Sequence, residues 1–170
     1  MQMNLNAYYR PSVEWDVEFL APWLRPMDKQ TIRWMTDMTA HDGLEYTFSN
    51  SAESNSIVVN DTVVGMFGIA GVTGQEGSPW LLMSDFLDTS PHLKKLFLVE
   101  CRRWIEAKKL EYKKMWNFVY KDHKQHIQWL EWLGFKVKDL YPQFGPYKKP
   151  FLYFEMEGKI YCAVSQVTQR

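Results

Sequence analysis

The sequence is poor in cysteine and contains no long apolar run. Its 170 residues include two cysteines, Cys101 and Cys162, which are too few for a disulfide framework and do not form a C-x-x-C pair. This excludes a zinc knuckle and indicates a reducing compartment. No stretch approaches the roughly 18 uninterrupted apolar residues of a transmembrane helix. The first ten residues also lack a cationic start followed by an apolar run, so we expect a soluble protein with no membrane span and no signal peptide.

Net charge is absent as well, because 20 Lys and Arg residues balance 20 Asp and Glu residues. Bulk charge therefore does not favour binding to nucleic acid, and we expect no such partner. The balance is a sum of two opposed blocks. Residues 1–93 carry 4 basic and 12 acidic groups, net −8, and residues 94–170 carry 16 basic and 8 acidic groups, net +8. A local basic face in the second half is compatible with this overall neutrality.

Apolar and aromatic residues are abundant, at 46% and 16% of the chain. A chain with so many large rings is not disordered as a whole, since disorder goes with few aromatics and high net charge. The length suits one ordinary domain rather than two. We therefore expect a single domain over residues 1–170, with a polar tail at residues 163–170.

Capping residues and apolar spacing predict four helices. Ser12 begins a helix that ends before Pro22, and Asp28 caps a second helix that runs to about residue 39, followed by a turn at residues 41–43. Ser90 and Pro91 begin the longest helix, because Ser suits the N-cap and Pro suits the first helical position. A fourth helix covers residues 123–133 and ends at Gly134. The long helix has an apolar stripe at steps of three and four, made of Leu93, Leu96, Phe97, Cys101, Trp104 and Ile105.

Short apolar runs predict the strands. A β-hairpin is expected over residues 57–69, with its turn at Asn60 and Asp61, and residues 71–79 are expected to form a loop. Further strands are predicted at residues 80–84, 115–120, 135–141 and 150–156, with a last extended piece after residue 159. Strand and helix alternate in the second half, which favours one parallel pair within an otherwise antiparallel sheet. The fold class is therefore α/β, with a mixed, mostly antiparallel sheet flanked by about four helices.

This order of elements resembles that of the GNAT acyltransferases. Two segments carry the resemblance, a strand, loop and long helix at residues 80–110 and a strand and helix at residues 116–137. Within the second segment, the residues that resemble the closing helix of the family and its Leu-Gly-Phe ending are Ile127, Leu130, Leu133, Gly134 and Phe135. The resemblance implies a single GNAT-like domain and acetyl-CoA as the expected cofactor.

A narrower resemblance rests on four short runs: Trp80 to Asp85, Trp116-Asn117-Phe118-Val119, His126-Ile127 and Trp129-Leu130. They resemble a small GNAT-like family encoded by tailed phages, which includes the internal virion protein A of short-tailed phages. This implies a role in virion assembly, ejection or host interaction, with other phage or host proteins as partners. It also implies a location in the host cytoplasm, in the virion, or in both.

The GNAT resemblance also implies where acetyl-CoA would bind. The family holds the pyrophosphate on backbone N–H groups between its fourth strand and the following helix, in a glycine-rich loop. Here that loop contains no glycine, carries Asp88, and loses one N–H donor at Pro91. These departures predict a protein that is not an efficient acetyltransferase. The positions that correspond to the cofactor site are Leu82, Met83, Ser84, Thr89, Ser90, His92 and Leu93.

Candidate catalytic residues are equally sparse. Many GNAT enzymes protonate the leaving thiolate with a tyrosine, and the corresponding position here is Leu130, which has no proton to donate. Tyr120 is a substitute donor, or simply a packed ring at a strand end. Asp85 follows the central strand, where a general base or a capping carboxylate is expected. His123 and His126 are one helical turn apart but lack further ligands, so we expect no metal site.

Three functions remain open. The first is a phage-type GNAT-fold protein that acts through its surface and does not transfer acetyl groups efficiently. The second is an active acetyl-CoA-dependent N-acyltransferase with an altered pyrophosphate loop. The third is a host-directed binding module that uses the basic run of residues 94–114, a run that is also typical of a solvated helix face.

Overall fold

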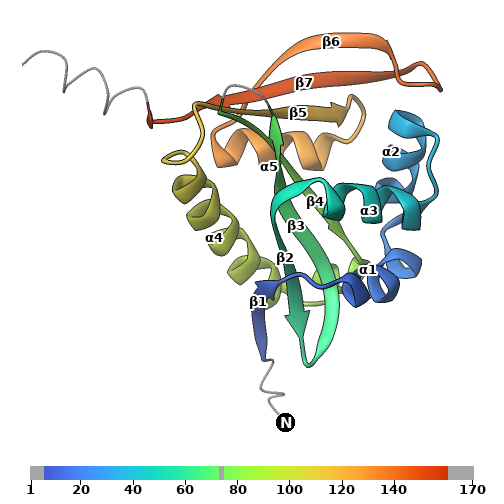
Figure 1. Ribbon diagram of the computed structural model, residues 1–170, viewed down its shortest axis with the longest axis vertical. Helices are drawn as coiled ribbons and strands as arrows, with labels where there is room; N and C mark the ends of the chain where they lie inside the picture. The colour runs from blue at the N-terminus through green and yellow to red at the C-terminus, as the bar shows by residue number, and fades with distance from the viewer. Residues whose placement is uncertain (1–5, 73–74, 161–170) are drawn as a thin grey trace, which may run out of the picture.

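The computed structural model describes residues 6–72 and 75–160. Seven strands and five α-helices, with two short 3₁₀ helices, make up these residues (Figure 1). In chain order they are β1 (Ala7–Pro11), α1 (Glu14–Leu20), η1 (Ala21–Trp23), α2 (Pro26–Thr36), α3 (Ala40–Ser49), β2 (Ser51–Val59), β3 (Thr62–Val72), β4 (Glu76–Met83), η2 (Asp85–Thr89), α4 (Pro91–Lys108), β5 (Lys114–Tyr120), α5 (Lys124–Leu133), β6 (Lys136–Phe144) and β7 (Lys149–Glu157).

All seven strands join one sheet in the order β1-β2-β3-β4-β5-β7-β6. Every neighbouring pair is antiparallel except β4 and β5, which are parallel. The predicted mixed α/β class is therefore confirmed, although five helices rather than about four cover the sheet. No helix in the described part of the chain has the length and apolar character needed to cross a bilayer.

The core consists of three clusters, which lie on the two faces of the sheet. Helices α1 to α3 pack against one face through apolar side chains that include Leu20, Ile32 and Leu44. Helices α4 and α5 cover the opposite face, where Ile105 and Leu133 pack against strands β3, β5 and β7. The space between β4 and β5 thus lies between two separately packed helical layers.

The expectations for the first fifty residues need correction. Asp28 is not a helix cap, because α2 begins at Pro26 and ends at Thr36, earlier than expected. The turn expected at residues 41–43 is also wrong, since these residues lie in α3. Thr39 begins that helix, with its side chain accepting a hydrogen bond from the Asp42 N–H.

Predictions for the rest of the chain fare better. The hairpin is confirmed, with Asn60 and Asp61 at positive φ in its turn. Ser90 is the N-cap of α4, and Gly134 ends α5 with a φ of 100°. The loop expected at residues 71–79 is largely strand, because β4 begins at Glu76 and pairs with β3 from there onward. The tail at residues 163–170 and most of the last extended piece lie outside the described residues.

Candidate functional site

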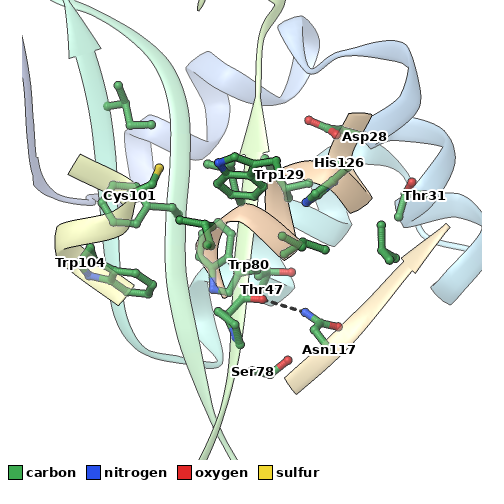
Figure 2. Close-up of a pocket in the computed structure, with 18 of the residues that line it drawn as sticks. Asp28, Thr31, Thr47, Ser78, Trp80, Cys101, Trp104, Asn117, His126 and Trp129 are labelled. Carbon is green, nitrogen blue, oxygen red and sulfur yellow. Dashed lines mark hydrogen bonds between the residues drawn. The ribbon is translucent and has the colours of Figure 1, made fainter. Parts of the chain in front are cut away.

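The sheet opens between β4 and β5. The two strands pair only at residues 76–77 of β4 and 114–115 of β5, and beyond these positions they diverge (Figure 1). The Asn117 side chain spans the start of the opening, where its Nδ2 donates a hydrogen bond of 2.9 Å to the Pro79 carbonyl (Figure 2). A side chain thus replaces the backbone ladder at the point where the strands separate.

One residue of β4 presents both its backbone N–H and its backbone C=O to this opening. The Ser84 N–H donates to the Val64 carbonyl, so the hydrogen-bonded pairs between β3 and β4 fall on the even-numbered residues of β4. The N–H and C=O of Leu81 consequently point toward β5, which has already diverged. They are free to complete a ladder with an extended ligand that carries amide groups.

The end of β4 is closed by the start of α2. The Met83 N–H donates to Asp28 Oδ2 at 3.0 Å, and the Met83 carbonyl accepts from the Arg25 N–H at 2.8 Å. Asp28 is 5% exposed and pairs with the Arg25 guanidinium. Burial raises the pKa of Asp28 despite the attraction of Arg25. This buried ion pair fixes one wall of the opening.

The opening leads into a cavity of about 690 Å³. Side chains from both helical layers line it, as Figure 2 shows for Thr31 of α2 and Cys101 of α4. We name two parts by their linings. The α2–α3 compartment is lined by Asp28, Thr31, Ile32, Met35, Thr36, Met38, Gly43, Tyr46, Thr47 and Asn50, and the α4 compartment is lined by Leu93, Leu96, Phe97, Glu100, Cys101, Trp104, Ile105 and Trp129.

The two compartments differ in polarity. The α2–α3 compartment carries several hydroxyl groups, an amide and the Asp28 carboxylate, whereas the α4 compartment is mainly apolar, with Glu100 as its charged residue. Burial raises the pKa of the Cys101 thiol strongly, so it stays protonated and is a poor nucleophile. Cys101 belongs to the apolar stripe that the spacing predicts, and it packs half-buried against the core cluster that contains Ile105 and Leu133.

Two histidines border the cavity at the start of α5. The rings of His123 and His126 meet edge to face, with centroids 5.0 Å apart. Burial lowers the pKa of His126 to about 3, with the neighbouring His123 and Arg25 acting in the same direction. Burial and Arg25 also lower the pKa of His123, although Asp28 opposes them. Both rings are therefore neutral at pH 7.

Tyr120 lies at the end of β5 and also lines the cavity. Its ring packs against that of Trp34 of α2, with the ring centroids 4.7 Å apart. Its hydroxyl donates a hydrogen bond of 3.2 Å to Asp122 Oδ2. Loss of water contact and the Asp122 carboxylate raise the pKa of Tyr120. The hydroxyl therefore remains protonated at neutral pH, and it must leave Asp122 to donate its proton to another group.

The arrangement of sheet, opening and cavity was compared with known proteins. No protein-family model and no curated protein matches the chain. Solved structures match it in fold, among them spermidine N-acetyltransferase from Vibrio cholerae in complex with CoA and spermine. That match has a TM-score of 0.63 and 12% identity and covers 92% of this chain and 98% of the enzyme. The fold is that of the GNAT acetyltransferases.

Two further structures support this assignment. The ribosomal-protein-S18-alanine N-acetyltransferase from Escherichia coli matches with a TM-score of 0.63 and 12% identity, over 89% of this chain and 94% of that one. A GNAT-family acetyltransferase from Bacillus anthracis matches with a TM-score of 0.62 and 10% identity, over the same shares of the two chains. At such low identity these likenesses establish the fold alone.

The residues predicted from the GNAT resemblance are only partly brought together. Leu82, Leu93 and Tyr120 line the cavity. Asp85 is exposed at the start of η2 and does not line it. Five predicted cofactor positions also lie outside the lining: Met83, Ser84, Thr89, Ser90 and His92. Their roles in cofactor binding stay predictions. Where such a role requires a backbone N–H group, it depends on whether that N–H group of the loop is free.

Two backbone donors of the loop that corresponds to the GNAT pyrophosphate site are already engaged. The Phe86 N–H is directed at Ser84 Oγ and the Ser90 N–H at the Leu87 carbonyl. Asp88 is paired with Lys94 at 3.1 Å, so its charge is partly compensated. A phosphate bound here would depend on lysine side chains more than on a backbone cradle.

Most of the basic run that follows is paired with acidic side chains. Arg103 contacts Glu100, Lys109 contacts Glu106, and the buried Lys108 contacts Glu53 and Glu111. Arg102 lies over the Trp132 ring, 4.2 Å from its centroid. These contacts match the solvated-face interpretation of the run better than an open basic patch.

Sequence reasoning missed the residues that shape the opening. Asn117 was part of the phage resemblance but had no assigned role, and Asp28 was taken for a cap. The α3 residues Thr47 and Asn50 were unassigned because their helix was not predicted. A sequence signal existed only for Asn117, a polar residue in the middle of an apolar strand.

Proposed function

We propose that this protein is an acyl-CoA-dependent N-acyltransferase. The observation that carries the proposal is the divergence of β4 from β5, which leaves the Leu81 peptide facing a large cavity. The pantetheine arm of CoA carries amide groups, which can hydrogen-bond to that peptide as a further strand would. Among the GNAT-fold structures that match, the spermidine enzyme was solved with CoA.

The acceptor enters the α2–α3 compartment in this proposal. An amine nitrogen attacks the thioester carbonyl carbon, the C–N bond forms and the C–S bond breaks. The amine gives up a proton and the departing thiolate takes one. The neutral ring of His123 accepts the first proton, and the Tyr120 hydroxyl donates the second. Asp85 has no part in this scheme, because it lies outside the lining.

Calorimetric titration with CoA and release of free thiol from acetyl-CoA test the proposal, with a panel of primary amines as acceptors. Tyr120→Phe retains the ring contact with Trp34 but lacks the proton, and should lower kcat about 100-fold with little change in CoA affinity. His123→Gln should lower kcat and should also remove the fall in kcat at acidic pH that protonation of His123 causes in the wild-type protein. His41→Gln is the control, because His41 lies on α3 and does not line the cavity. Failure of wild-type protein to bind CoA would remove the proposal.

An exposed aromatic row supports a second candidate, the phage-type role in virion assembly or host contact. Trp15, Phe19 and Trp23 follow one another at steps of four along α1 and η1 and are 72%, 68% and 73% exposed. Exposed aromatic clusters of this kind are typical of protein contacts. In purified virions of an encoding phage, mass spectrometry should detect the chain and should detect less of a triple serine variant. Equal incorporation of both chains would refute a docking role for this row.

A further inference from the structure

We propose that the α4 compartment holds an acyl chain longer than acetyl, so that the donor is a medium- or long-chain acyl-CoA. This inference rests on the proposed function and adds the class of acyl group. Three observations support it: the way in which α4 is attached, the polarity and size of the space beneath it, and one polar atom without a partner.

Helix α4 is packed more tightly at its ends than in its middle. Near its N-terminus, Leu93 is buried with Leu87 and Met83. Toward its C-terminus, Ile105 joins the core beneath α5, and Trp104 Nε1 donates to Glu53 at 2.9 Å. Between these attachments the apolar stripe that the sequence predicts lines the cavity.

The middle of the stripe is correspondingly incompletely buried. Leu96 lines the cavity and is 45% exposed, whereas the spacing predicts a core position. Phe97 and Cys101 are only half-buried. An apolar stripe that the protein covers only in part is unfavourable in water, and an apolar ligand would cover the rest.

The size of the cavity points the same way. A single buried water needs about 10–15 Å³ of cavity volume. A cavity of about 690 Å³ therefore has room for several tens of groups of that size. A pantetheine arm with an acetyl group fills only part of that space. The remaining volume borders on the aromatic and aliphatic side chains of the α4 compartment, which suit methylene groups.

A purely hydrocarbon ligand would leave one atom unsatisfied. Among the described residues, Trp129 Nε1 is the buried side-chain nitrogen or oxygen for which no hydrogen-bond partner is found. Trp129 lines the cavity (Figure 2). Its ring stacks on that of Phe97 of α4, with the ring centroids 6.2 Å apart. The Nε1 atom is out of contact with solvent in this arrangement, so a shift of the ring is needed to bring its N–H to a carbonyl oxygen of an acyl thioester or of its pantetheine arm. An occupant that combines a chain with carbonyl groups would then satisfy it.

Binding of a chain-length series to the wild-type protein tests the proposal. The series comprises CoA and acetyl-, butyryl-, octanoyl- and palmitoyl-CoA, measured by calorimetry and by tryptophan fluorescence, at concentrations below micelle formation. Affinity should rise with chain length, by up to about fourfold for each methylene that is buried. An equal affinity for acetyl-CoA and octanoyl-CoA would overturn the proposal while leaving the proposed function intact. Failure of every CoA species to bind would overturn both.

Variants on α4 locate the effect. Cys101→Phe should fill the α4 compartment and abolish the gain from butyryl- to octanoyl-CoA, with acetyl-CoA binding unchanged. Val99→Phe is the matched control, because Val99 lies on the same helix, is 43% exposed and does not line the cavity. Phe97→Ala should have the opposite effect and shift the preference to longer acyl chains. This variant keeps the test decisive if Cys101→Phe does not fold. A gain with chain length that persists in folded Cys101→Phe protein would overturn the placement.

Binding of free octanoate distinguishes an acyl-CoA from a free fatty acid as the source of the chain. Without CoA it lacks the pantetheine amides that the Leu81 peptide and the Trp129 N–H would engage, so it should bind at least tenfold more weakly than octanoyl-CoA. Equal affinity for octanoate and octanoyl-CoA would make the compartment a site for free fatty acids and refute the role assigned here.

Discussion

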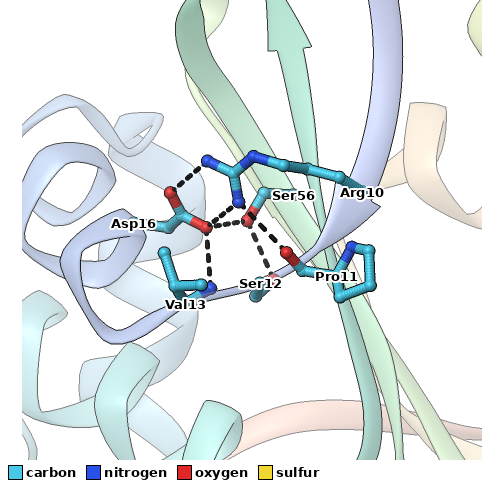
Figure 3. A network of polar contacts seen from close by, with 6 residues as sticks. All are labelled: Arg10, Pro11, Ser12, Val13, Asp16 and Ser56. Atoms are coloured by element: carbon cyan, nitrogen blue, oxygen red, sulfur yellow. Dashed lines mark hydrogen bonds and ion pairs between the residues drawn. The ribbon is translucent and has the colours of Figure 1, made fainter.

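Substitution of Asp16 provides a sharp test of how the first helix is attached to the sheet. The carboxylate is 2% exposed and accepts four hydrogen bonds (Figure 3). Arg10 Nη1 and Nη2 donate at 2.7 and 2.8 Å, the Val13 N–H at 2.9 Å, and Ser56 Oγ at 2.7 Å. These donors come from β1, from the residue that precedes α1, and from β2, so a single side chain joins three segments.

Asp16→Asn retains the size of the side chain but replaces one acceptor oxygen with a donor. The guanidinium then faces an N–H₂ group instead of a carboxylate. Removal of one partner from a buried ion pair costs about 3–5 kcal/mol. The Arg10 side chain is 37% exposed and thus partly screened by water, so we expect a loss near the lower end, about 3 kcal/mol. For a chain of this length, such a loss lowers Tm by roughly 6–12 °C.

Urea denaturation at pH 7, with the midpoint and slope fitted separately, measures this loss. Asp37→Asn is the matched control, since the Asp37 side chain is 59% exposed in its pair with Arg33 and should contribute less than about 1 kcal/mol. Arg10, the Val13 N–H and Ser56 together lower the pKa of Asp16 despite its burial. The contribution is therefore present above the ordinary carboxylate pKa and should disappear as the pH falls through the lowered value. A loss below 1 kcal/mol at pH 7 would refute the assigned role.

Two further predictions concern pH and backbone contact. The folded pKa of His126 is about 3, so the unfolded chain binds one more proton between about pH 3 and 6.5. Stability should fall by up to about 1.4 kcal/mol per pH unit below pH 6.5, and His126→Gln should reduce that slope in urea titrations. In contrast, His41→Gln should leave that slope unchanged, because Glu18 raises the pKa of His41 and its effect on stability therefore falls above pH 6.5. Gly145 has a φ of 67° and an added Cβ would lie 2.3 Å from the Trp34 carbonyl, so Gly145→Ala should cost about 1–3 kcal/mol. Gly71→Ala, with open space around it, should leave the denaturation midpoint nearly unchanged; equal effects at both glycines would contradict the contact.

The helices that the sequence predicts well are those whose signals are local. Ser90 and Pro91 begin α4, and Gly134 ends α5, because capping depends on residues within one turn of the helix end. Helix α3 was missed for the opposite reason. Gly43 was read as a turn residue, but it lies where α3 meets α2, and an added Cβ would be 2.3 Å from Ile32 Cγ2. Its small size serves a contact between helices, which no local pattern reveals.

The beginning of β4 illustrates the same limit. Residues 71–79 contain Gly, Ser and Pro and were expected to form a loop. Pairing with β3 makes most of them strand, and Gly77 is required there because an added Cβ would lie 2.5 Å from Ile69 Cδ1. Strand pairing, and not propensity, decided this segment.

The sequence by itself determined the α/β class, the order of most elements and the likeness to GNAT acyltransferases, because these depend on periodicity, caps and short motifs. It also identified the departures in the phosphate loop, which are differences in residue type. Only the tertiary structure decided where β4 and β5 separate, which helices enclose the cavity, and which titratable groups border it. Those features depend on contacts between segments far apart in the chain, such as Asp28 with Met83 and Asn117 with Pro79. The apolar stripe of α4 was evident from its spacing, but only the packed structure reveals that its middle faces a cavity instead of the sheet.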